Sequence, residues 1–413
     1  MSSSRQSDEK QVLHLFFHIA ITFQQNLSVQ LNSTQFNSIQ FNLTALNLTQ
    51  HITLEKRWLE RSTQETGVVI RQVNRSRNMT ALSPHHDRIT TIASLFAAMS
   101  VGASLAWMYK SHLDRQYKCI PTELLKSTHV KELRLALLLA LQCGNNMMQH
   151  YSKKGTLDQL SESDLGITTK GCAEDFCTVI DVINENLVIQ GIHKYFPLHK
   201  IIGEESTGTG TIPPLTNAPT WIIDPIDGTT NFASGLPLSC VSLGFCVDGK
   251  PVLGVVYAPA TKEIYLAVRG HGAYRNGVKL DPMKRVTPLS SAVVNTEFGY
   301  ARSKEAVNIM LQGMGKIMTH GCRTTRQMGS GVLDLCYVAS GRLDIVYSGL
   351  AGEGWKPWDY CAGLVICLEA GCAIEALMNQ TDGKEFDIYS TSVICATSKV
   401  LLDETRKVLI DKE

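Results

Sequence analysis

The order of elements along this sequence predicts an α+β fold in which helices and sheets form separate layers. An amphipathic, leucine-rich segment comes first, a run of strand-like segments follows, and the last third mixes apolar helical and strand-like segments. Each of these elements has an apolar face that must be buried against a neighbour, so helices and sheets are expected to pack in layers. The 413 residues are enough for one large domain or two smaller ones.

The first 118 residues differ in composition from the rest. They contain no cysteine and no glycine before Gly67, and the stretch from Gln25 to Gln50 is rich in Asn, Gln, Ser and Thr. Such a composition cannot bury a core, so we expect residues 1–88 to form a polar, largely disordered extension. Six N-x-S/T sequons lie here, and a sequence of this composition also creates them by chance: Asn26, Asn32, Asn42, Asn47, Asn74 and Asn78.

The segment Ile89–Tyr109 carries no charged residue and is long enough to cross a bilayer as a helix. Trp107 and Tyr109 suit a membrane interface at one end. Basic residues flank both ends, so they do not orient the segment. Two interpretations stay open: a transmembrane anchor, or a targeting segment if translation starts at Met79 or Met99.

Charge and cysteine content exclude several function classes. The 39 basic residues are balanced by 38 acidic ones, which argues against a nucleic-acid partner. All twelve cysteines lie between Cys119 and Cys395, without a C-x-x-C pair. This pattern is typical of reduced, buried thiols in a cytosol-like compartment rather than of a disulfide framework or a zinc site. We therefore expect the folded part to be cytoplasmic, whether or not residues 89–109 anchor it to a membrane.

Hydrophobic periodicity predicts the elements in order. A helix spans Glu123–Tyr151, a polar loop follows from Ser152 to Thr169, and a second helix runs from Val182 to Phe196. Five strands come next, with a hairpin turn at Asp248-Gly249-Lys250: Lys200–Ile202, Trp221–Ile223, Val241–Val247, Val252–Tyr257 and Glu263–Val268. Two further helices are predicted at Gly331–Ala339 and Tyr360–Ala370, the latter ended by Gly371.

The run W-I-I-D-P-I-D-G-T-T-N-F over residues 221–232 is the most informative motif. Pro225 fixes its own φ and lacks an N–H, so we expect the strand to end there. Gly228 permits a tight turn, and Thr229 and Thr230 can cap a following helix.

This turn would direct Asp224 and Asp227 into one space, with the backbone carbonyl of Ile226 between them. Three hard oxygen ligands that converge in this way suit Mg²⁺. A short D-x-x-D-G motif on its own is also compatible with an Asx-type turn that has solvated acids. Two further acidic motifs favour the metal: Gly203-Glu204-Glu205-Ser206 after a predicted strand, and Trp358-Asp359 at the start of a predicted helix.

Together these motifs resemble those of the inositol monophosphatase family, a group of Mg²⁺-dependent, lithium-sensitive phosphatases. The resemblance runs from about Glu123 to the C-terminus and rests on W-I-x-D-P-I-D-G-T-T-N-F, W-D-x-x-A-G, and G-E-E-S between Asp181 and Asp224. It implies a layered α+β sandwich of the inositol monophosphatase and fructose-bisphosphatase type, with residues 110–413 as the catalytic domain. It also implies a homodimer that hydrolyses myo-inositol monophosphate through a metal-activated water.

The resemblance implies two or three Mg²⁺ ions. One would be bound by Glu204, Asp224 and the Ile226 carbonyl, and a second by Asp224, Asp227 and Asp359. Thr229 would orient and deprotonate the attacking water.

Several residues before Glu204 match the family's supporting positions. Asp181 would orient Thr229, and it could also serve as the N-cap of the second helix. Asp175 and Thr178 precede it with the family's spacing. Lys170 matches a basic loop residue that approaches the metals, and a solvated loop lysine is the alternative.

The substrate would lie against two turns. The amides of Gly228, Thr229 and Thr230 open a helix and can bind a phosphate, next to Asp227 and Asp359. The second turn is Gly329-Ser330-Gly331, where family members more often have Gly-Thr-Ala. Gly331 is expected to loosen that turn, which leaves the ring contacts open. A ring-binding glutamate usually precedes the W-D motif, and Glu353 is the nearby candidate, displaced by about one position.

The substrate class follows from Thr230-Asn231-Phe232. Relatives that act on 3′-phosphoadenosine 5′-phosphate more often continue G-T-K-x-F, so this sequence favours inositol monophosphate. Another small phosphorylated polyol, such as galactose 1-phosphate or histidinol phosphate, is an alternative. A membrane-anchored, inactive scaffold is the alternative from a different class, and the intact set of acids argues against it because unpaired buried acids are costly to keep.

Overall fold

The computed structural model describes residues 120–154, 161–170, 176–282, 288–352, 354–378 and 385–410, all of which belong to the compact unit Ser100–Glu413. The predicted extension 1–88 and the apolar segment 89–109 lie outside the described residues, as do Asp175 and Glu353. None of the helices in these described ranges is long and apolar enough to cross a membrane.

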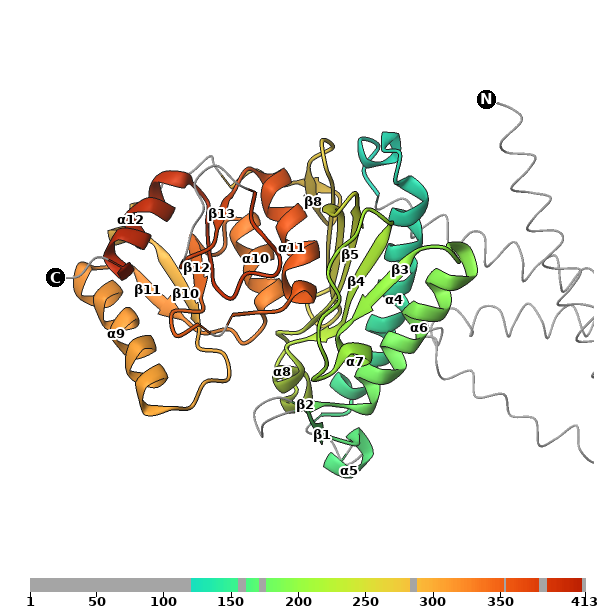
Figure 1. Ribbon diagram of the computed structural model, residues 1–413, viewed down its shortest axis with the longest axis horizontal. Coiled ribbons are helices and arrows are strands. Elements are labelled where there is room, and N and C mark those ends of the chain that lie inside the picture. Colours follow the sequence, from blue (N-terminus) through green and yellow to red (C-terminus); the bar gives the residue numbers. More distant parts are fainter. Residues whose placement is uncertain are drawn as a thin grey trace, which may run out of the picture. The chain divides into compact units, whose positions relative to one another are not determined.

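Helices and sheets alternate in layers within this unit (Figure 1). Helices α4 (Val130–Tyr151) and α6 (Val179–Tyr195) cover one face of a seven-stranded sheet. The other face packs on α11 (Pro357–Ala370), beside which lies α10 (Gly331–Ala339). The predicted layered α+β class is therefore confirmed.

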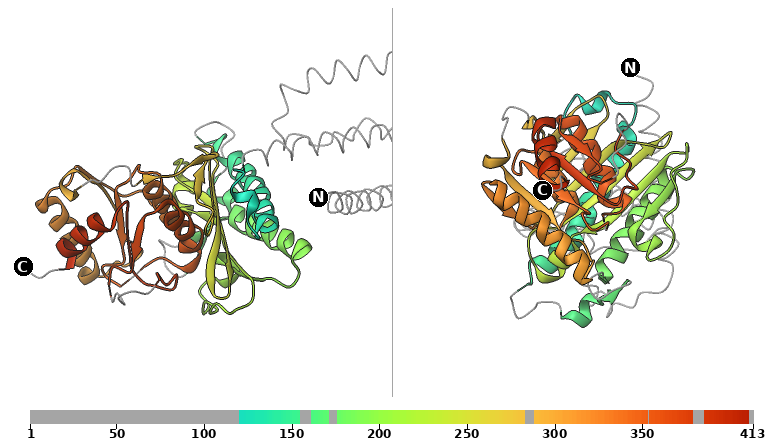
Figure 2. Two further views of the ribbon diagram at one scale, coloured as in Figure 1. Left: turned by 90° about the horizontal axis from the view of Figure 1, so that it is seen from above. Right: turned by 60° about the vertical axis from the view of Figure 1, so that its left-hand side comes forward.

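A five-stranded sheet follows on the far side of α10 and α11. Its outer face is covered by α9 (Lys304–His320) and α12 (Lys399–Ile410), which pack against β-strand side chains such as Ile345 and Ile394. The two views of Figure 2 show the same order of layers from other sides.

The seven-stranded sheet has strands in sequence order, with β3 parallel to β4 and every other pair antiparallel. Asp248 and Gly249 connect β5 and β6 with φ angles of 50° and 72°, so the predicted hairpin turn is confirmed. The strands are β3 (Lys200–Gly203), β4 (Thr220–Asp227), β5 (Cys240–Val247), β6 (Lys250–Ala258), β7 (Glu263–Val268), β8 (Ala273–Arg275) and β9 (Val278–Lys279).

The five-stranded sheet is mixed and has the order β11-β10-β12-β14-β13. Strand β10 is parallel to both of its neighbours, and β14 is antiparallel to both of its own. These short strands were not predicted from the sequence: β10 (Val293–Glu297), β11 (Thr324–Arg326), β12 (Ile345–Ser348), β13 (Ala373–Glu375) and β14 (Val393–Ala396).

Pro225 does not end β4, contrary to the prediction. The strand continues to Asp227, and its pairing with β5 is irregular between Asp224 and Asp227. An irregularity of this kind takes residues out of the regular ladder, so the missing N–H of proline loses no strand hydrogen bond there. The prediction was wrong because proline is excluded from a regular ladder position but not from a bulge.

Three helices also begin at residues other than predicted, among them α11, which begins at Pro357 rather than Tyr360. A 3-10 turn at Leu124–Lys126 precedes α4, which begins only at Val130. The hydroxyl of Ser127 accepts a hydrogen bond from His129 N at 3.0 Å, and serine side chains that bind nearby backbone groups interrupt helices. Helix α6 begins at Val179 rather than Val182.

The predicted loop from Ser152 to Thr169 contains regular structure. A short helix, α5 (Glu162–Leu165), and β1 (Thr168–Thr169) lie in it, and β1 pairs with β2 (Phe176–Cys177). Ser161 and Asp164 bind each other's backbone N–H at 3.2 and 2.9 Å. This is the S-x-x-D capping pattern, which the sequence contained.

Helix α11 lies close to the seven-stranded sheet because two strand positions facing it are glycines. A Cβ on Gly254 would lie 2.4 Å from the carbonyl oxygen of Ala362, and one on Gly244 would lie 2.3 Å from Cys361 Sγ. The first turn of α11 is thereby placed near the end of β4.

Candidate metal centre

Three carboxylates from two distant parts of the chain meet at the end of β4. Ligand oxygens of Asp224, Asp227 and Asp359 lie within 4.8 Å of one another. Asp224 and Asp227 are 1% and 7% exposed at the end of β4, and Asp359 lies in the first turn of α11. The structure thus brings together three of the four acids that the sequence predicted as ligands.

Burial and mutual repulsion make this cluster unfavourable without a cation. Burial raises the pKa of Asp224 well above its ordinary value, and the nearby Glu204, Asp227 and Asp359 raise it further. Burial, Asp227 and Glu204 raise the pKa of Asp359 in the same way. No lysine or arginine of the described ranges forms an ion pair with the three aspartates. A dense set of hard oxygens of this kind fits Mg²⁺.

Hydrogen bonds fix the direction of all three aspartates, and Asp224 Oδ1 accepts from Ile226 N at 3.0 Å. Asp227 Oδ2 accepts from Ser330 Oγ and from Val332 N at 3.0 Å. Burial raises the pKa of Asp227 to about 6, although these two hydrogen bonds act in the opposite direction. Asp359 Oδ2 accepts from Lys356 N at 2.6 Å, as the third residue of the helix in a capping box.

The turn after β4 differs in one respect from the prediction. The N-cap of α8 (Thr229–Ser234) is Gly228, in the left-handed region at φ 79°, so Thr229 and Thr230 do not cap the helix. Thr229 is the first helical residue, and its hydroxyl lies 3.0 Å from Ile226 O and 3.3 Å from Asp181 Oδ1. The prediction that Thr229 and Thr230 cap this helix was wrong, because the left-handed conformation of Gly228 already turns the chain into the helix.

Asp181 holds the start of α6 from inside the helix. Thr178 is the N-cap, and Asp181 Oδ2 accepts from Thr178 N at 2.9 Å and from its hydroxyl at 2.5 Å. The interpretation of Asp181 as the N-cap was therefore wrong. The side chain is fully buried, which raises its pKa to about 6, and the task of orienting Thr229 stays a prediction.

Glu204 lies beside the aspartates but is paired with a lysine. It is the first residue of α7 (Glu204–Thr207), and Lys170 Nζ lies 2.7 Å from its carboxylate and 2.8 Å from that of Glu205. Burial alone would lower the pKa of Lys170, but the two carboxylates reverse this and raise it. Lys170 is only 10% exposed, so the alternative of a solvated loop lysine was wrong.

The second glycine-rich turn leads from β11 into α10. Gly329 has φ 73° and Ser330 is the N-cap. Gly331 is the first residue of α10 and is packed under a tryptophan, and the expectation that it loosens the turn stays a prediction. A Cβ there would lie 2.9 Å from the ring of Trp355.

Asn231 connects the two turns, a role that was not predicted from the sequence. Its Nδ2 donates to the carbonyl oxygens of Leu238 and Met328 at 2.8 Å and of Gly329 at 3.1 Å. The signal for this role was weak, because an asparagine in the first turn of a helix is equally typical of local capping.

Helix α6 also carries two buried polar residues that were not predicted as part of the site. Asn184 donates to Pro225 O at 3.4 Å, and Glu185 accepts from backbone amides of α7. With Asp181 they occupy positions i, i+3 and i+4, which form one helix face. That spacing of polar residues was visible in the sequence.

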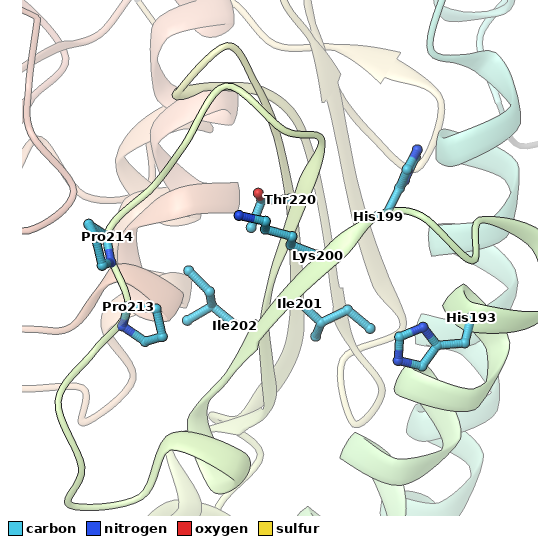
Figure 3. A pocket seen from close by; sticks show the side chains of 8 residues that line it. All are labelled: His193, His199, Lys200, Ile201, Ile202, Pro213, Pro214 and Thr220. Carbon is cyan, nitrogen blue, oxygen red and sulfur yellow. The ribbon is translucent and has the colours of Figure 1, made fainter.

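A separate cavity of about 310 Å³ lies along the edge strand β3 (Figure 3). None of the four predicted acidic ligands lines it. His199, one of its lining residues, accepts from Trp221 Nε1 at 3.2 Å and stacks on Phe196, so its ring is engaged in packing. The geometry therefore favours the carboxylate cluster as the functional site. The lining residues are His193, His199, Lys200, Ile201, Ile202, Pro213, Pro214 and Thr220.

Comparison with known proteins agrees with this geometry. The chain is 38% identical over 267 residues to inositol monophosphatase 2 of Solanum lycopersicum, which covers 64% of this chain and 90% of that protein. It is 35% identical over 246 residues to inositol monophosphatase 1 of Homo sapiens, covering 60% and 86%.

Solved structures show the same fold. The inositol monophosphatase of Thermotoga maritima aligns with a TM-score of 0.55 and 31% identity, over 68% of this chain and 96% of that one. The inositol monophosphatase of Anabaena aligns with a TM-score of 0.55 and 27% identity, over 69% and 97%. Residues 131–410 match the inositol monophosphatase family as a whole, and with the acidic cluster in place we conclude that the chain belongs to that family.

Proposed function

We propose that this chain is a Mg²⁺-dependent phosphomonoesterase that hydrolyses myo-inositol monophosphate to inositol and phosphate. The observation that carries the proposal is the cluster of the buried Asp224 and Asp227 with the half-buried Asp359, which has no cationic partner within the described ranges. The relatives named inositol monophosphatase support the same substrate class.

The proposed ligands of two or three Mg²⁺ ions are the three aspartates together with Glu204 and the Ile226 carbonyl. When bound, Mg²⁺ neutralises phosphoryl oxygens, lowers the pKa of a bound water and stabilises the leaving alkoxide. The chain itself places these acids on a strand end and on helix first turns, where hydrogen bonds to Ser330 and to Lys356 N hold two of them.

The protein's own contribution to the water is the Thr229 hydroxyl. It faces two acceptors, Ile226 O and Asp181 Oδ1. A hydroxyl has one proton to donate and two lone pairs, so while it donates to one of them it can accept a hydrogen bond from the attacking water. Asp181 is fixed by Thr178 and would keep Thr229 in that orientation.

Substrate binding is proposed at the two turns that Asn231 connects. The phosphate would lie against the amides of Gly228, Thr229 and Thr230, and the polyol against Gly329 and Ser330, with Gly331 fixed beneath Trp355. Glu353 stays a proposed ring contact on sequence grounds alone.

A phosphate-release assay on the full chain tests this function. Myo-inositol 1-phosphate should be hydrolysed with Mg²⁺, with no turnover in EDTA and with inhibition by Li⁺. Galactose 1-phosphate, histidinol phosphate and 3′-phosphoadenosine 5′-phosphate belong in the same panel. A clear preference for one of these would refute the inositol substrate, and no release from any of them would favour an inactive scaffold.

Location and assembly are proposed from the sequence. We infer a cytoplasmic catalytic domain over residues 110–413 and a homodimer, with residues 89–109 as either a membrane anchor or a targeting segment. Carbonate extraction with a glycosidase-shift gel tests the location and the anchor, and a glycosylated Asn379 would contradict a cytoplasmic domain. Light scattering tests the homodimer, and a monomer at micromolar concentration would contradict it.

A further inference from the structure

Two glutamates outside the proposed ligand set each hold two successive backbone amides beside the site. Glu185 Oε2 accepts from Glu205 N at 2.8 Å, and its Oε1 accepts from Ser206 N at 2.7 Å. Glu297 Oε1 accepts from Met328 N at 2.7 Å and from Gly329 N at 2.9 Å. Each carboxylate therefore fixes the path of a turn rather than a single side chain.

Glu185 fixes the turn that carries Glu204. The amides of Glu205 and Ser206 lie in the first turn of α7, where amides have no partner within the helix. Glu185 is 3% exposed, and a Cβ on Gly203 would lie 2.6 Å from its carboxylate carbon. The backbone on both sides of Glu204 is thus in contact with one buried carboxylate.

The same face of α6 reaches two other parts of the metal centre. Asp181 contacts the Thr229 hydroxyl at 3.3 Å, and Asn184 donates to Pro225 O at 3.4 Å, within the irregular part of β4. Asn146 in turn donates to Asn184 Oδ1 at 2.9 Å. A single rigid helix therefore sets the spacing between Glu204, the bulge of β4 and Thr229.

Glu297 fixes the other turn. It is the last residue of β10, and Asn295 Nδ2 donates to the same oxygen that binds the two amides, at 3.1 Å. Ser330 follows these amides directly, and its hydroxyl donates to Asp227. The position of Gly329 and Ser330 relative to the metal centre thus depends on Glu297.

We propose that Glu185 and Glu297 are positioning residues with separate tasks, an inference that rests on the proposed function. Glu185 sets the affinity for Mg²⁺ through the Glu204 turn, and Glu297 sets the affinity for the substrate through the Gly329–Ser330 turn. The physical basis is that hydrogen bonds from amides to a carboxylate are about twice as strong as neutral ones. Residues that orient metal ligands also affect metal affinity strongly.

The way each carboxylate uses its oxygens predicts different tolerance to glutamine. Glu185 uses both oxygens, so in Glu185→Gln an NH₂ group would face an amide N–H. Glu297 uses one oxygen for both amides, so Glu297→Gln can keep these bonds, whereas Glu297→Met cannot. Glutamine should therefore disrupt the hydrogen bonds to the turn at position 185 and preserve them at position 297.

The experiment measures Mg²⁺ binding by calorimetry, and KM at saturating Mg²⁺, on the full chain. Glu185→Gln should weaken Mg²⁺ binding by about 10-fold or more and change KM by less than about twofold. Glu297→Met should raise KM by about 10-fold and weaken Mg²⁺ binding less than Glu185→Gln does, because its turn holds one proposed ligand, Asp227, through Ser330 and carries none itself. Glu297→Gln should resemble the wild type in both.

Glu263→Gln is the matched control, because Glu263 is a buried carboxylate, 7% exposed, that binds Arg342 instead of a turn of the site. The Glu263→Gln variant should change neither the Mg²⁺ affinity nor KM. If Glu185→Gln folds poorly, Glu185→Asp serves instead, since the shorter acid reaches one amide and should weaken Mg²⁺ binding to a smaller extent.

Parallel changes of Mg²⁺ binding and KM in both variants, or a loss of thermal stability alone, would overturn the division of tasks. A wild-type chain that binds Mg²⁺ but hydrolyses no phosphomonoester would refute the proposed function, and with it the task of Glu297. The task of Glu185 would then still be decided by the calorimetry alone.

Discussion

Replacement of Gly254 by alanine would test whether the close packing of α11 on β6 positions the metal centre. The new Cβ would lie 2.4 Å from the carbonyl oxygen of Ala362 and 3.0 Å from its carbonyl carbon and Cα. All three neighbours are helix backbone atoms, which cannot rotate away as a side chain can. Either β6 or α11 must therefore shift.

The loss of folding stability in Gly254→Ala can be estimated from the atoms that clash. Overpacking a core typically costs about 1–3 kcal/mol, and a rigid backbone neighbour places this site at the upper end, about 3 kcal/mol. For a compact unit of this size, Ser100–Glu413, that corresponds to a fall of roughly 5 °C in melting temperature. Asp359 lies one turn before Ala362 on α11, so its displacement should also lower kcat/KM by roughly 10-fold or more, even where the protein is fully folded.

Urea unfolding followed by circular dichroism gives the stability, and phosphate release at 25 °C or below gives the activity. Gly315→Ala is the control: Gly315 lies within α9, and a Cβ there would have no neighbouring atom within 4 Å, so alanine should stabilise the helix by up to about 1 kcal/mol. A Gly254→Ala protein with wild-type unfolding midpoint and activity would refute the argument that this contact positions α11.

Three other changes test separate parts of the site and core. Asp224→Asn should lose at least about 10³-fold in turnover, because one charge and one ligand oxygen vanish, while thermal unfolding in EDTA is unimpaired; near-normal turnover would contradict its assignment. Burial lowers the pKa of His150 below its value in the unfolded chain. The neutral imidazole therefore contributes to folding stability above the unfolded pKa of about 6.5, and this contribution is lost as the pH falls. His150→Gln should therefore lose less stability in urea unfolding between about pH 7.5 and pH 5.5 than the wild type, and an equal loss would be inconsistent with this. Asn231→Asp removes the donor to three carbonyl oxygens and should cost about 2–3 kcal/mol and raise KM, whereas an unchanged urea midpoint would show that the turns do not depend on it.

Much of the fold could be predicted because its information is local. The helix Gly331–Ala339 and the glycine that ends α11 were identified correctly, since apolar spacing and a C-terminal glycine are properties of neighbouring residues. The hairpin between β5 and β6 follows from Asp248-Gly249, which adopt positive φ at low cost. The family also follows from short motifs, because each places its acids on one strand end or one helix turn.

Other features depend on contacts that sequence spacing does not contain. The short strands of the five-stranded sheet carry too few residues for a periodic signal, and α10 and α12, which pack against them, come from separate parts of the chain. The continuation of β4 through Pro225 depends on its irregular pairing with β5. A proline considered without this pairing predicts that the strand ends at Pro225.

The sequence by itself determined which acids could bind a metal, because Asp224, Asp227 and Asp359 lie in motifs whose local conformation exposes them at the end of an element. Only the tertiary structure decided that they meet. Asp359 reaches the end of β4 because glycines on the sheet let α11 approach closely, and Lys170, Glu185 and Asn231 find their partners across separate elements. Such pairings arise from the packing of whole helices on sheets, which no local pattern of residues specifies.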